Sequence, residues 1–402
     1  MPTEMKILVC NVGSTSLKFK LYQMPQGIVL ARGRAERVGS RGDALFGYNN
    51  DITGFSIDLE KQDIPGYSVG VRRFLEHLTD KEHGVIEKIA DINRVGYKAT
   101  VSKGHMAVHE ISEAVLQGMR DWLPIAPLHN QGYLDTIAVM REQLPDAIFV
   151  GCFETAFHRN IPLCRRLYGV PYEWYEKYGV QRLGYHSASH GYIASVLEKK
   201  IGPRYRAVSC HLGGSSSVCA IRDGVSVDTS FGMSLQTGLI HANRTGDLDC
   251  EVVPFLRAVG MPEAEIDAGI HTKGGLNGIS GVSGDLRYVQ AAAEQGNARA
   301  QLAIDVFVDG IVRYIGGFHV EMEGLDTLVF TAGIGENSAL IRRLVCEKLA
   351  VLGVKLDAEK NAVCRGEADL SAPDSRVRVL VIPTDEEKGI ADWTYRYRRQ
   401  AD

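Results

Sequence analysis

The sequence predicts an α/β protein built from a duplicated unit. Segments with the short apolar runs of strands alternate along the chain with segments of helical periodicity, which is the pattern of α/β layers. Two hairpin sequences with turns rich in Gly and Ser, ILVCNVGSTS ending at Ser16 and AVSCHLGGSSS at 207–217, align with each other. Each hairpin opens a similar order of strands, so we expect two halves with the ligand bound between them. A chain of 402 residues is long enough for two domains.

Composition excludes several classes of protein. The net charge of -4 gives no global electrostatic case for binding nucleic acid or an anionic membrane. No apolar stretch approaches the roughly 20 residues of a membrane span, and the polar N-terminus leads directly into KILVCN without the apolar segment of a signal peptide. The eight cysteines are scattered without a CxxC pair, which favours a reducing, cytoplasmic environment.

Periodicity predicts several strands before the first helix. In the first half we expect strands at 6–11, 16–23, 29–37, 52–59, 92–96 and 147–153, and helices at 69–78, 111–122 and 133–144. In the second half we expect strands at 207–212, 217–222, 327–331 and 377–382, and helices at 298–315, 338–351 and 387–397.

Three glycine-rich segments could bind phosphate or nucleotide. In NVGSTS and HLGGSSS, small residues would let backbone N–H groups approach an anion, and hydroxyls would add donors. A third segment, FTAGIGEN at 330–337, follows a strand and opens a helix, which is a junction suited to a nucleotide. For either hairpin alone a plain turn is the favoured interpretation, whereas two such turns facing one cleft favour phosphate. The Walker A pattern GxxxxGK[ST] does not occur in the sequence.

Motifs in order and spacing along nearly the whole chain resemble those of the acetate kinase and propionate kinase family, in the sugar kinase–Hsp70–actin superfamily. They are NVGSTSLK from Asn11, APLHN at 126–130, ETAFH at 154–158, LGYHSASH at 183–190, HLGGSSS, TGLIHANRTG around Arg244, SGDLR, FTAGIGENS and VIPTDEE ending at Glu387. The resemblance implies a duplicated actin-like (ribonuclease H-like) two-domain fold with an interdomain cleft. One domain would take 1–154 plus 387–402, and the nucleotide-binding domain would take 155–386.

The resemblance also implies residue roles. His186 and Arg244 would bind the γ-phosphoryl group in transfer with His129 beside it, and Lys98 and Glu154 would complete the catalytic set. Glu386, with Asn11, would hold Mg²⁺. Residues binding ATP would be Asn11, Ser14, Ser16, Lys18, His211, Gly213, Gly214, Ser215, Ser216, Asp285, Leu286, Arg287, Gly333, Ile334, Gly335, Glu336 and Asn337. The pocket for the acid would be lined by Thr100, Leu128, Tyr185 and Leu235.

This chain departs from the family pattern at positions to which the resemblance assigns a catalytic or binding role. Lys98 stands for an Arg, Glu154 for an Asp, Gly214 for an Asn, and HANR at 241–244 for MGTR. Lys lacks the planar fork of Arg, so a carboxylate or phosphoryl group would be held differently. In the acid pocket Thr100 replaces a Val, Tyr185 a Phe and Leu235 a Pro, which makes the pocket more polar.

The predicted reaction is the reversible transfer of the γ-phosphoryl group of ATP to a short-chain carboxylate such as acetate, with Mg²⁺, to give an acyl phosphate and ADP. Two alternatives remain open: a related kinase for a more polar small acid, and a degenerate ATP-binding sensor without turnover. A pyrophosphate-using relative is disfavoured because GIGEN is retained. The resemblance further implies a cytoplasmic homodimer. His190 could be no more than a helix residue behind a cap at Ser187 or Ser189.

Overall fold

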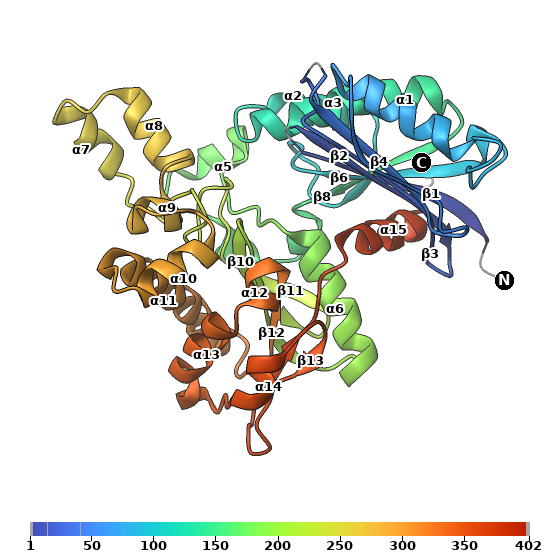
Figure 1. Ribbon diagram of the computed structural model, residues 1–402. Helices are drawn as coiled ribbons and strands as arrows, with labels where there is room; N and C mark the ends of the chain where they lie inside the picture. Colours follow the sequence, from blue (N-terminus) through green and yellow to red (C-terminus); the bar gives the residue numbers. More distant parts are fainter. Residues whose placement is uncertain (1–2, 14, 41, 399–402) are drawn as a thin grey trace. The chain divides into compact units, whose positions relative to one another are not determined.

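The computed structural model describes residues 3–13, 15–40 and 42–398, with only the backbone of residues 127–129. The chain divides into two compact units, each with its own sheet (Figure 1). Unit 1 comprises Met1–Ala156 and Asp385–Asp402, and unit 2 comprises Phe157–Thr384. Glu386, which the sequence analysis assigned to the second domain, therefore belongs to unit 1.

Unit 1 contains an eight-stranded sheet of order β5-β4-β3-β2-β1-β6-β8-β7. The strands are β1 (Met5–Val12), β2 (Ser16–Met24), β3 (Ile28–Glu36), β4 (Ala44–Asn50), β5 (Ser56–Gln62), β6 (Ile92–Ala99), β7 (Val108–Glu110) and β8 (Ile148–Phe153). The helices are α1 (Tyr67–Leu78), α2 (Glu113–Asp121), α3 (Pro127–Gln143) and α15 (Glu386–Arg396).

Helices cover both faces of this sheet. Phe19 of β2 stacks on Phe74 of α1 with ring centroids 4.7 Å apart, so α1 packs on one face. On the other face α15 passes so close to β6 that a Cβ on Gly96 would lie 2.3 Å from Thr394 Oγ1. A glycine is therefore needed for this close approach. The C-terminal helix is thus part of unit 1 (red in Figure 1).

Unit 2 contains a six-stranded sheet of order β11-β10-β9-β12-β14-β13. The strands are β9 (Arg206–Leu212), β10 (Ser216–Arg222), β11 (Val225–Thr229), β12 (Thr327–Thr331), β13 (Ala368–Asp369) and β14 (Arg378–Val381). The helices are α4 (Leu163–Arg166), α5 (Tyr172–Tyr178), α6 (Ser187–Ile201), α7 (Val252–Ala258), α8 (Glu263–His271), α9 (Gly275–Ser280), α10 (Leu286–Glu294), α11 (Ala298–Glu321), α12 (Ala332–Asn337), α13 (Ala339–Lys348) and α14 (Ala358–Val363).

The two sheets share one topology, which confirms the predicted duplicated α/β fold. The order β3-β2-β1-β6-β8 in unit 1 corresponds to β11-β10-β9-β12-β14 in unit 2. In each, the first three strands form antiparallel pairs and the later strands pair in parallel. Asn11 and His211, aligned by sequence, each lie one residue before the end of β1 and β9. The aligned hairpins are therefore equivalent structural elements.

Three local predictions were wrong in detail. The strand expected at 52–59 begins only at Ser56, because residues 51–53 form a turn between β4 and β5. The glycine segment after β12 is itself the short helix α12 rather than a loop before a helix. The helix expected at 298–315 continues to Glu321. No helix in the described part of the chain has the length and apolar character required to span a bilayer.

Candidate active site

Eight of the seventeen residues expected to bind ATP come together in unit 2 around a pocket of about 760 Å³, whereas Asn11, Ser14, Ser16 and Lys18 belong to unit 1. Members of that set in the lining are Gly213, Gly214, Asp285, Leu286, Arg287, Gly333, Ile334 and Asn337. These residues come from three segments distant in sequence. The other lining residues, which were not predicted, are Ala242, Asn243, Ser283, Gly284, Gln290 and Ser338. Several lie inside motifs already recognised, HANR and SGDLR, so the motif was found but not every member.

The two glycines of α12 have different roles. A Cβ on Gly333 would meet no atom within 4 Å, so this position opens onto the pocket. A Cβ on Gly335 would lie 3.3 Å from the carbonyl carbon of Phe330, so Gly335 permits close packing of α12 on β12. Gly333 therefore leaves its backbone open toward the pocket, whereas Gly335 is needed for the packing of α12.

Arg342 of α13 supports α12 and was missed by the sequence analysis. Its side chain is buried, with 1% exposed, and Nη1 donates to the carbonyl oxygens of Gly335 at 2.9 Å and Glu336 at 2.8 Å. Nε donates to Asn361 Oδ1 at 2.8 Å. Glu336, expected at the nucleotide, instead accepts a hydrogen bond from the backbone N–H of Thr384 at 3.2 Å and does not line the pocket.

The second hairpin turn is held by hydrogen bonds within the site. Ser216 Oγ donates to the Gly213 carbonyl at 3.0 Å, and the Ser216 N–H donates to His241 Nδ1 at 3.0 Å. Burial, aided by Arg244, lowers the pKa of His241 to about 3, so this ring is neutral and can accept. The Ser215 hydroxyl is buried, and among the described residues it has no hydrogen-bonding partner.

A cluster of histidines lies between α6 and the sheet of unit 2. His186 precedes α6 with a left-handed φ of 60°, a conformation uncommon for a residue with a Cβ. Its ring stacks on His211, with centroids 4.0 Å apart. His211 Nδ1 lies 2.8 Å from Ser189 Oγ, so His211 is bound to α6 and does not line the nucleotide pocket. His190, interpreted from sequence as an ordinary helix residue, is fully buried in this cluster.

Arg244 lies in the loop that carries the HANR tetrad. Its Nη1 donates to the carbonyl oxygen of Leu235 at 2.6 Å, and burial lowers its pKa. Despite this lowering, the guanidinium of Arg244 remains protonated near neutral pH. The contact uses one of five N–H donors, so the guanidinium has capacity to bind an anion. Leu235, expected to line the acid pocket, therefore fixes Arg244 through its backbone.

In unit 1 the expected metal and catalytic groups share the face of the sheet covered by α15. Val9 of β1 pairs with Gly96 of β6, so Asn11 and Lys98, each two residues further, point to that same face. Lys98 Nζ lies 2.6 Å from Glu386 Oε2 and 3.2 Å from Glu154 Oε1. Burial alone lowers the pKa of Lys98, but the two carboxylates outweigh it and hold that pKa well above its usual value. Lys98 is therefore a cation shared by two acids.

The remaining expected residues are placed as follows. Ser16 and Lys18 lie in the β1–β2 hairpin, where Lys18 pairs with Asn11. Tyr185 is buried and its hydroxyl donates to the Met233 carbonyl at 2.5 Å. Thr100 is 5% exposed, and no hydrogen bond of its hydroxyl occurs among the residues described here. Ser14 lies outside the described residues, as do the side chains of Leu128 and His129.

The chain matches a model of the Acetokinase family over residues 6–392. The chain belongs to the acetokinase family. It is 40% identical over 399 residues to an acetate kinase of Acetivibrio thermocellus, covering 98% of this chain and 99% of that protein. An acetate kinase structure from Porphyromonas gingivalis superposes with a TM-score of 0.87 at 36% identity, covering 97% of this chain and 98% of that one. A propionate kinase structure from Francisella tularensis superposes with a TM-score of 0.87 at 29% identity, covering 97% and 99%.

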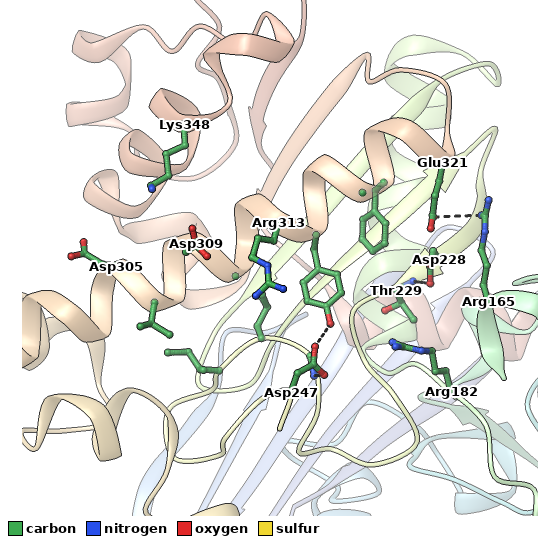
Figure 2. A pocket seen from close by; sticks show the side chains of 18 residues that line it. Arg165, Arg182, Asp228, Thr229, Asp247, Asp305, Asp309, Arg313, Glu321 and Lys348 are labelled. Carbon is green, nitrogen blue, oxygen red and sulfur yellow. Dashed lines mark hydrogen bonds and ion pairs between the residues drawn. The ribbon is translucent and has the colours of Figure 1, made fainter. Parts of the chain in front are cut away.

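This acetokinase also has a larger pocket, of about 840 Å³, beside α11 in unit 2 (Figure 2). None of the residues expected at the active site lines it. Arg165 lies 3.6 Å from Glu321, and Tyr314 donates to Asp247 at 2.6 Å. Asp228 also lies here, and burial raises the pKa of both Asp228 and Glu321. Cations and acids are mixed along this pocket, so its size does not make it the candidate active site.

Proposed function

We propose that this acetokinase transfers the γ-phosphoryl group of ATP reversibly to a short-chain carboxylate, giving an acyl phosphate and ADP. The observation that carries the proposal is the nucleotide pocket of unit 2, where residues of the HLGGSSS, SGDLR and FTAGIGEN motifs converge. In this reaction a carboxylate oxygen forms a bond to the γ-phosphorus while the β,γ-bridging P–O bond breaks and ADP leaves. Direct in-line transfer requires no covalent enzyme intermediate.

At the nucleotide end, Gly333 would let the adenosine lie against the backbone of α12. Asp285 caps α10 by accepting from the Arg287 N–H at 2.9 Å and also binds the Arg287 guanidinium, with Nε to Oδ1 at 3.0 Å. These hydrogen bonds hold Asp285 and Arg287 in place in the wall of the pocket that the nucleotide would contact. Around the turn at 213–216, small residues leave room for phosphate oxygens.

The metal groups of unit 1 fit Mg²⁺. Asn11 and Glu386 offer only oxygen ligands, and Mg²⁺ is commonly held by one or two protein oxygens while phosphates and water supply the rest. When bound, Mg²⁺ would neutralise charge on the phosphates. Lys98 would keep the Glu386 carboxylate oriented through their 2.6 Å contact.

At the transferred group, Arg244 and His186 would supply donors to the equatorial oxygens, where negative charge spreads during transfer. The family resemblance assigns His129 to the same group. The Lys98–Glu154 pair would replace the Arg and Asp of the family pattern. Their contact at 3.2 Å indicates that a longer acid and a shorter base still meet, which favours an adapted site over a decayed one.

A more polar acid is a second candidate, and Thr100 is the observation that favours it. Its hydroxyl has no partner among the described residues, so a substrate hydroxyl could pair with it. Tyr185 gives less support than its sequence suggested, because its hydroxyl already donates to Met233. The test is a coupled kinase assay with ATP and Mg²⁺ against acetate, propionate and their hydroxy and amino derivatives.

In that assay we expect acyl phosphate from at least one short acid. A preference for acetate and propionate over every polar acid would reject the second candidate. Measured ATP binding with no transfer to any acid would reject the kinase and leave a nucleotide sensor. A cytoplasmic homodimer is proposed as well. Its support is the family resemblance, together with eight free cysteines for the reducing compartment.

A further inference from the structure

A chain of hydrogen bonds leads from His186 into the core of unit 2. His186 Nδ1 lies 2.8 Å from Ser217 Oγ, which lies 2.8 Å from His190 Nε2. The other nitrogen of that ring, His190 Nδ1, lies 2.9 Å from Ser209 Oγ. His190, Ser209 and Ser217 are fully buried. The chain therefore has three contacts in series, each of which needs one proton.

His190 can supply only one of these protons. Burial holds the pKa of His190 well below its usual value, and the neighbouring His158 and His211 rings lower it further. The ring is therefore neutral and carries a single N–H. Each serine hydroxyl also carries one hydrogen. Because each group has a single hydrogen to donate, the three hydrogen bonds all run in the same direction whenever Ser217 donates within the chain.

In the first orientation, His186 Nδ1 is an acceptor. Ser217 donates to it, His190 Nε2–H donates to Ser217, and Ser209 donates to His190 Nδ1, so every hydrogen is used. In the second orientation, His186 Nδ1–H donates to Ser217, and all three bonds reverse. The Ser209 hydrogen then has no acceptor, because Ser209 makes no other side-chain hydrogen bond in the described ranges. A buried donor without an acceptor is unfavourable, so the first orientation is preferred.

We propose that the Ser217–His190–Ser209 chain holds His186 as the neutral tautomer with its hydrogen on Nε2, so that His186 serves as an N–H donor to the transferred phosphoryl group. The role in transfer rests on the proposed function; the tautomer does not. Protonation of His186 at Nδ1 would force the second orientation. Ser217, His190 and Ser209 are thus positioning residues that select the charge state of His186.

The surroundings of His186 agree with a neutral ring. Titratable side chains packed against it include His190 of α6 and His211 of β9, and Phe231 covers one edge with ring centroids 5.2 Å apart. His211 stacks at 4.0 Å, and two cationic rings at this separation would repel each other.

The direct test is ¹⁵N-histidine NMR of the full-length protein, with His186 assigned from the signals lost in His186→Gln. We expect a protonated Nε2 and an unprotonated Nδ1 from about pH 6 to about pH 8, around the ordinary pKa of histidine. An Nδ1–H tautomer or an imidazolium as the main form in that range would overturn the proposal. Because this readout needs no substrate, it decides the tautomer even if no acid is phosphorylated.

Variants test whether the Ser217–His190–Ser209 hydrogen-bond chain determines the tautomer of His186. Ser217→Ala should mix the His186 tautomers and lower kcat about five- to thirtyfold, the effect of losing one buried hydrogen bond, with little change in the KM for ATP. Ser217→Thr keeps a hydroxyl and should restore the parent spectrum. Ser226→Ala is the matched control, because it removes a 2.9 Å hydrogen bond to buried His158 without touching the chain. Unchanged His186 signals in Ser217→Ala would contradict the proposal.

Discussion

Replacing Lys98 by Met tests the shared cation of unit 1. The side chain is 20% exposed and contacts two carboxylates, and Met has a similar length without charge. Removing one partner of a buried ion pair costs about 3 to 5 kcal/mol, and the residual exposure places Lys98 near the lower value. For a unit of this size, about 3 kcal/mol corresponds to a fall in Tm of roughly 6 to 12 °C. Differential scanning calorimetry measures that fall.

Mg²⁺ provides a second readout of the same variant. Without Lys98, Glu154 and Glu386 lose the cation that they share, so added Mg²⁺ should raise the Tm of the variant more than that of the parent. Lys61→Met is the matched control, because Lys61 forms an exposed pair with Asp43 and its loss should leave Tm unchanged. A Lys98→Met protein as stable as the parent, with no larger response to Mg²⁺, would refute the reasoning.

Lys98→Arg distinguishes two interpretations of unit 1: a site adapted to use Lys98 with Glu154, and an acetate kinase site weakened by the loss of the family's Arg. The cation already lies 2.6 Å from Glu386, so a longer planar head should crowd the two acids and lower kcat. If the site is instead a weakened acetate kinase, the same change should raise acetate turnover. The steady-state rate with acetate, measured in parallel with Tm, distinguishes these outcomes.

Three further predictions follow from other parts of the molecule. Arg244→Ala should lower kcat about 10³-fold while ATP affinity, measured by calorimetry, changes little; equal loss of both would contradict a role in transfer. Gly333→Val should raise the KM for ATP far more than that for the acid, because the added side chain enters the nucleotide pocket without meeting the fold. In Glu321, burial next to Asp228 raises the pKa to about 7, so the folded state holds this proton more tightly and stability falls as pH rises from about 4.5 to 7. In Glu321→Gln the free energy of unfolding, measured with urea, should fall by about 1 kcal/mol less than in the parent over this pH range; the value is reduced for solvent screening. Identical pH profiles of the parent and the variant would reject this assignment.

The sequence by itself determined many of the longer strands and helices and the equivalence of the two hairpins, but it did not predict β4, β7 or β11. Alternating apolar residues and Gly/Ser turns are local signals, and they identified β1–β2 and β9–β10 because strand pairing through a short turn needs only neighbouring residues. Eight residues of the nucleotide pocket were also predicted, through the resemblance of their motifs to a known family, whereas six other lining residues were not. The strand expected at 52–59 failed because a turn at 51–53 interrupts an apolar run.

Only the tertiary structure decided what the polar side chains do. Lys98 and Glu386 are 288 residues apart in sequence, and their contact exists because α15 returns to the sheet of unit 1. His190 has the sequence context of an ordinary helix residue, yet packing of α6 on β9 and β10 places it between two serines. Arg342 likewise binds carbonyls of a separate helix. Backbone conformation follows from nearby residues, whereas a buried polar group takes whatever partner the packing of distant segments brings within hydrogen-bonding distance.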